Sequence, residues 1–137
     1  MNVIYHLSYI VGLTFIIGET LKRGFGEFAV NATTMFEDYL GGAILIAAAL
    51  LWHKRHQLAP KMMIVAWSYS LGGLMVPFFA HLEAWLRGVT YRPDHPHEDI
   101  GAVITKGVLW SVCLVCVIVT VRIADRAFAE RLASSKR

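Results

Sequence analysis

Residues 38–61 read DYLGGAILIAAALLWHKRHQLAPK, an apolar run that ends abruptly in a basic turn. Three further apolar runs lie at residues 1–17, 62–85 and 100–121. A helix of about 17–25 mostly apolar residues is long enough to cross a bilayer. The run at 38–52 is shorter, and we expect its flanking aromatic and charged side chains to reach the interface. The sequence therefore predicts an all-α membrane protein with four transmembrane helices.

The charges of the connecting segments alternate in sign. The loop at 53–61 and the tail at 122–137 carry eight Lys or Arg and two Asp or Glu, a net charge of +6. The rest of the chain carries five Lys or Arg and eight Asp or Glu, a net charge of −3. Short loops rich in Lys and Arg face the cytoplasm. We therefore expect both termini in the cytoplasm and a multi-pass protein of the cell inner or plasma membrane.

The composition agrees with this class. Hydrophobic residues make up 56% of the chain and charged residues 17%, against roughly 25% charged residues in soluble domains. The basic residues flank apolar runs, so we expect membrane lipids, and not nucleic acid, as their partners. No Lys or Arg precedes the first run and no small-residue cleavage site follows it, so we expect this run to be retained.

We expect one domain over residues 1–137, an antiparallel four-helix bundle, because short connections make successive helices neighbours. The glycine pairs at 41–42 and 72–73 offer places for close helix contact. Residues 18–37 form the longest predicted connection, and residues 86–99 a turn-rich loop. The fourth helix is expected to continue into the tail as a short amphipathic helix.

Pro77 interrupts the third apolar run and removes a helical hydrogen bond. Helical spacing places Ser70, Pro77 and His81 on one stripe. This stripe either packs against neighbouring helices or lines a ligand-binding cavity that opens toward the outer side. We take the three residues as ligand-binding candidates.

Ionisable residues gather at one depth near the outer ends of the predicted helices. Such groups inside membrane segments usually face the bundle interior and pair with one another. One interpretation is an interfacial ion pair or an outward-reaching lysine without chemistry. The other is a site for a polar headgroup or for proton transfer, with five catalytic candidates: Glu19, Asp38, His81, Glu83 and Lys106.

Two further patterns carry possible chemistry. His95 and His97 are candidate metal ligands, but H-P-H matches no established metal-site spacing, and a solvated loop without metal is expected. Cys113 and Cys116 form C-x-x-C inside the fourth run. This motif resembles that of vitamin K epoxide reductases, which are also four-helix membrane proteins. Thiols in apolar surroundings are unreactive.

A second resemblance covers about the first 75 residues. Gly18 with Lys22, the stretch FEDYLGGAIL at 36–45 and the basic residues at 54–55 resemble the DoxX-like group of small four-helix membrane proteins. The resemblance implies a small membrane subunit associated with quinone-linked or sulfur redox proteins, and it implies no catalytic residue.

Two functions follow as hypotheses. The first is a membrane component that binds a lipid, a quinone or a partner subunit, alone, as a homo-oligomer or in a larger complex. The second is a small membrane enzyme that uses the acid, His and Lys groups for acid–base chemistry on a lipophilic substrate. A transporter is a third possibility and requires at least a dimer. The sequence assigns no cofactor.

Overall fold

The computed structural model describes residues 2–89 and 100–135, which form helices and the turns between them. The chain begins with α1 (Asn2–Leu13), which passes through a π-helical turn η1 (Thr14–Gly18) into α2 (Glu19–Arg23). Three long helices follow, α3 (Glu27–His53), α4 (Ala59–Arg87) and α5 (Ile100–Ser135). The all-helical prediction is confirmed for the described residues.

Four segments are long and apolar enough to cross a membrane: Val3–Leu21, Ala32–His53, Ala59–Arg87 and Ile100–Ala129. Each is longer than the run predicted at its place. The predicted connection at 18–37 is mostly helical, because it holds α2 and the start of α3, which only a short turn that includes Gly24 separates. A helix satisfies its own backbone groups, which lipid cannot do, so helical structure extends beyond the purely apolar residues.

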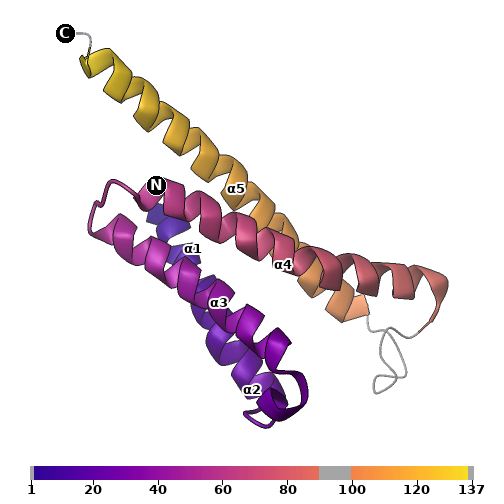
Figure 1. The fold of residues 1–137 in the computed structure, drawn as a ribbon. Helices are drawn as coiled ribbons and strands as arrows, with labels where there is room; N and C mark the ends of the chain where they lie inside the picture. The colour runs from indigo at the N-terminus through magenta and orange to yellow at the C-terminus, as the bar shows by residue number, and fades with distance from the viewer. Residues whose placement is uncertain (1, 90–99, 136–137) are drawn as a thin grey trace.

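Consecutive long helices pack side by side and run in opposite directions (Figure 1). The start of α1 meets the end of α3, where the rings of Tyr5 and His53 stack 5.9 Å apart. Farther along, α4 meets α5 at Phe78 and Trp110, whose rings also stack at 5.9 Å. The two termini lie toward one end of the molecule, and we call the opposite end the distal end. Toward it, the α1–α3 pair and the α4–α5 pair diverge.

The buried core takes residues from α1, α3, α4 and α5. Trp67 from α4 is its largest member, and the two cysteines of α5 belong to it. Cys113 and Cys116 are free thiols, 1% and 3% exposed. The other members are Val11, Leu45, Ala48, Ala49, Met63 and Ala66. Most are small, so the helix backbones approach one another closely.

Glycines set the closest helix contact. A Cβ on Gly42 would lie 2.6 Å from the carbonyl oxygen of Gly12, and a Cβ on Gly12 would lie 2.9 Å from that of Gly42. The neighbouring Gly41 faces α4, where a Cβ would lie 3.2 Å from the Tyr69 ring. The pair at 41–42 thus makes the predicted close contacts, on two different helices. The prediction is wrong for Gly72, which has no atom within 4 Å of its Cβ position.

α4 continues through Pro77 without ending, and Pro60 occupies its first turn, a position that proline favours. α5 has 36 residues, which corresponds to a length of about 54 Å. It therefore exceeds the roughly 30 Å of a bilayer core. The predicted continuation of the fourth helix into the tail is confirmed as far as Ser135.

The glycine contact predicts a difference between two Gly→Ala variants. Gly42→Ala should lower the stability of the detergent-solubilised protein by roughly 1–3 kcal/mol, because the new methyl group meets backbone that cannot move aside. Gly72→Ala adds the same methyl group in open space and should leave stability unchanged or raise it by up to about 1 kcal/mol. Thermal unfolding measures both. Equal stability of the two variants would contradict the close α1–α3 contact.

Candidate functional site

Four of the five ionisable candidates lie on the interior sides of their helices near the distal end. Glu19, Asp38, His81 and Lys106 are all half-buried, and we call this set the distal polar layer. Residues seven or eighteen apart on a helix share a face. Asp38 is seven residues before buried Leu45, His81 eighteen after buried Met63, and Lys106 seven before buried Cys113. The layer therefore continues the faces that form the core.

The two acidic members belong to the α1–α3 pair. The side-chain oxygens Oε2 of Glu19 and Oδ2 of Asp38 are both buried. Glu19 follows the π-helical turn η1, a feature often found at functional sites. The adjacent Thr20 donates its hydroxyl hydrogen to the carbonyl of Ile16 and accepts one from the hydroxyl of Tyr39. This hydrogen bond joins α2 to α3 through the residues that directly follow Glu19 and Asp38 in the sequence.

Glu83 does not share this placement. It follows His81 by two residues, which turns it about 200° around the helix. Its carboxylate pairs with Arg87 at 2.6 Å, and the two side chains are 58% and 70% exposed. The structure thus separates Glu83 from the other four candidates.

Sequence reasoning missed Glu37 as a contact between α3 and α4. The Tyr69 hydroxyl donates to the carbonyl oxygen of Glu37 at 3.5 Å. The Glu37 side chain also reaches α4, since its Oε1 lies 3.5 Å from the Cβ position of Gly73. This distance is an ordinary van der Waals contact, and no pattern in the sequence pointed to it.

The three predicted ligand-binding residues lie on the interior face of α4. Ser70 is 2% exposed, and its hydroxyl donates to the carbonyl of Ala66 at 3.0 Å. Pro77 and His81 are half-buried. None of the three is among the residues that line the groove described next. Their role in ligand binding stays a prediction.

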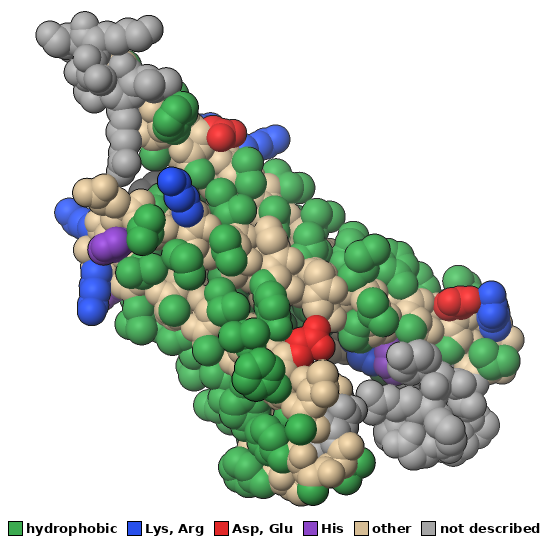
Figure 2. Space-filling view, viewed as in Figure 1, with side chains coloured by type: hydrophobic (Ala, Val, Ile, Leu, Met, Phe, Trp, Pro, Cys, Tyr) green, Lys and Arg blue, Asp and Glu red, His purple; other side chains and the backbone are tan. Residues whose placement is uncertain are grey.

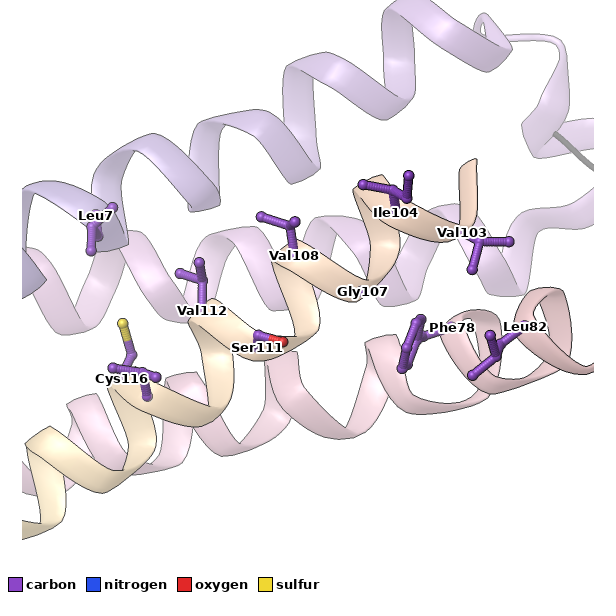
Figure 3. A pocket seen from close by; sticks show the side chains of 11 residues that line it. Leu7, Phe78, Leu82, Val103, Ile104, Gly107, Val108, Ser111, Val112 and Cys116 are labelled. Carbon is purple, nitrogen blue, oxygen red and sulfur yellow. The ribbon is translucent and has the colours of Figure 1, made fainter. Parts of the chain in front are cut away.

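An apolar groove of about 660 Å³ lies between α1 and the α4–α5 pair, open on one side (Figure 3). We call it the α1–α5 groove. Its only hydroxyl group belongs to Ser111, whose side chain is exposed. Leu7 of α1 contributes from one side, and α4 contributes Phe78 and Leu82. α5 supplies the rest: Val103, Ile104, Gly107, Val108, Ser111, Val112, Val115 and Cys116.

Close packing of α4 on α5 forms the floor of this groove. A Cβ on Gly107 would lie 2.9 Å from Cε2 of Phe78, so the glycine admits the Phe78 ring against the α5 backbone. Trp110 stacks on the same ring and meets Phe79 edge-on at 5.7 Å. α1 packs on α3 through its glycine contact and meets α4 where the Ser8 hydroxyl lies 3.4 Å from Sδ of Met63, but along the groove it contributes only Leu7 to the lining. The groove is the resulting gap in side-chain packing.

The described residues hold no group of three His, Cys, Asp or Glu side chains that could bind a metal ion. The candidate ligands His95 and His97 lie outside the described residues. The C-x-x-C cysteines pack in the core next to apolar side chains, away from the distal polar layer.

No protein-family model, no curated protein and no solved structure matches this chain. The resemblances to the DoxX-like group and to vitamin K epoxide reductases therefore remain expectations from the sequence.

The Thr20–Tyr39 hydrogen bond predicts a coupling that a double-mutant cycle measures. Tyr39→Phe and Thr20→Val should each destabilise the solubilised protein, and the double variant should lose less than the sum by about 0.5–1.5 kcal/mol. Glu83→Gln serves as the control, because an exposed i,i+4 pair contributes only about 0.3–0.5 kcal/mol. Strict additivity of the two variants would show that the hydroxyl groups do not bond.

Proposed function

We propose that this chain is a four-span membrane protein, with both termini in the cytoplasm, that binds a lipophilic molecule, a lipid or a quinone, in the α1–α5 groove. The alternation of loop charges supports the orientation. On the face shown in Figure 2, apolar side chains are the most frequent kind between the two ends of the molecule, and many large apolar side chains are exposed. Such a surface suits lipid, because large exposed apolar areas are rare on soluble monomers.

The groove is the observation that carries this proposal. Its volume of about 660 Å³ falls within the roughly 300–1,000 Å³ of ligand pockets, which occur preferentially between helices in bundles. Its lining is apolar apart from Ser111, so it suits an alkyl or isoprenoid chain. Leu7 and Cys116 lie at one end and Val103 and Leu82 at the other. A bound chain would therefore run along α5.

The distal polar layer supports a polar head on this molecule. Leu82 follows His81 directly, and Val103 lies one helical turn before Lys106. The distal end of the groove thus adjoins the elements that carry the layer. A ligand with an apolar chain and a polar head would place the head toward these side chains.

The half-buried ionisable groups favour acid–base catalysis as a second candidate function. A His and two carboxyl groups near a lipophilic site are residue types that transfer protons. In this case Glu19, Asp38, His81 and Lys106 would supply the chemistry and exposed Glu83 would not. Conversion of the bound molecule by the wild-type protein, lost in His81→Gln and retained in Glu83→Gln, distinguishes an enzyme from a binding protein.

The binding proposal predicts the effect of filling the groove. Val108→Trp places a large ring in the groove and should lower the amount of co-purified lipophilic molecule about tenfold or more, the loss expected for about 1.4 kcal/mol of binding free energy. Val65→Trp is the matched control, because Val65 is similarly exposed on α4 and does not line the groove. Mass spectrometry of the extracted molecules, normalised to protein, measures the loss.

Equal retention by Val108→Trp and Val65→Trp would contradict binding in the groove. If a protein subunit and no lipophilic molecule were lost from Val108→Trp, the groove would be a site for a partner helix, and the proposed ligand would be wrong.

A further inference from the structure

The turn between α3 and α4 carries three cations, Lys54, Arg55 and Lys61, together with the neutral side chain of His56. Lys54, Arg55, His56 and Lys61 are all exposed, and we call these four residues the basic turn. No Asp or Glu occurs between residues 39 and 82. Figure 2 shows Lys, Arg and His side chains gathered where α3 meets α4. The charge therefore has no acidic neighbour within either helix near this turn.

The backbone of the basic turn is fixed by hydrogen bonds. The N–H of His56 donates to the carbonyl of Leu51 at 2.9 Å, and the N–H of Arg55 donates to that of Trp52 at 3.0 Å. These two bonds form a Schellman motif at the end of α3. Nδ1 of His56 also accepts a hydrogen bond from the N–H of Leu58 at 3.2 Å. The charged side chains thus project from a rigid turn.

Arg55 occupies the position of this motif that normally holds glycine. Its φ of 52° lies in the left-handed region, which is unfavourable for a residue with a Cβ. Among the described residues, Arg55 is the only non-glycine residue with a positive φ. Non-glycine residues in this region occur preferentially at functional sites, which is a reason to test the role of this side chain.

The helix dipoles explain only part of the charge. Cations near the C-terminus of α3 interact favourably with the helix dipole, which explains why positive charges such as Lys54 and Arg55 occur there. Lys61 lies in the first turn of α4, where the dipole is positive and a cation is unfavourable. The positive end of α4 and the basic turn therefore reinforce one another, and together they attract an anion.

Aromatic side chains near this turn fit a position at the surface of a membrane. Trp52 is half-buried just before the turn, and Tyr5 of α1 stacks on His53 with its hydroxyl 3.4 Å from Nδ1. Trp and Tyr mark the headgroup level of a bilayer. We propose that the basic turn binds the phosphate headgroup of an anionic phospholipid. This inference rests on the proposal that α3 and α4 span a membrane.

Arg55→Gly tests this proposal, because it removes the charge and keeps the left-handed backbone. In nanodiscs that contain equal amounts of phosphatidylglycerol and phosphatidylcholine, the wild-type protein should enrich phosphatidylglycerol among its bound lipids. Arg55→Gly should lower this enrichment about fivefold, the factor for one cation near an anionic surface. Its unfolding temperature should be unchanged or higher. Arg55→Lys should keep most of the enrichment.

Arg87→Gln is the control, because it removes one exposed charge at the distal end and should bind lipid like the wild type. An equal loss in Arg55→Gly and Arg87→Gln, or no loss in Arg55→Gly, would overturn the proposal. Displacement of phosphatidylglycerol by excess inorganic phosphate would show a site for the free anion instead. Arg55→Gly should retain the molecule in the α1–α5 groove, so failure of this site and failure of the groove are distinguishable.

Discussion

The contact between Gly12 and Gly42 is the constraint on which the rest of the structure depends. The α1 and α3 backbones meet there at a distance that leaves no room for a Cβ on either side. Lipid offers no hydrophobic gain for helix association, so close packing of this kind, together with hydrogen bonds between helices, supplies the attraction between spans. Gly41, one residue before this contact, admits the Tyr69 ring of α4. α3 thereby holds α1 on one face and α4 on another.

The groove and the distal polar layer follow from this arrangement. α1 is held on α3, while α5 packs on α4 through Gly107 and the Phe78–Trp110 stack. The two pairs diverge toward the distal end, so the residues there do not close into an apolar core. The side chains that continue the interior faces at this end are ionisable and half-buried. We therefore propose that the space for the ligand arises because two tightly packed helix pairs diverge.

The sequence was sufficient for the helices because each span must satisfy its backbone groups internally. Four apolar runs predicted the long helices, and the Gly41–Gly42 pair predicted close contact. Gly12 was missed because a single glycine in an apolar helix gives no such signal. The helical start of α3 was missed because the stretch from 27 to 37 mixes polar and apolar residues.

The candidate site was only partly predictable. The predicted depth in the membrane grouped Glu83 with His81. The side of a helix on which a residue lies depends on its exact position in the helical repeat, and Glu83 lies on a different side from His81 and pairs with Arg87. The α1–α5 groove depends on the separation of two helices far apart in the sequence, which no local pattern records. The left-handed Arg55 was likewise hidden, because arginine is not expected at a glycine position.

The central claim is that four helices cross a membrane with both termini in the cytoplasm. The side of the membrane from which a residue can be labelled tests this claim most directly. Gln57→Cys and Val89→Cys place thiols at exposed positions beyond opposite ends of α4, while the native cysteines are buried. A membrane-impermeant maleimide added to intact cells should label Val89→Cys, and should label Gln57→Cys only after permeabilisation. Labelling of both from the same side, or of Gln57→Cys alone from outside, would contradict this account.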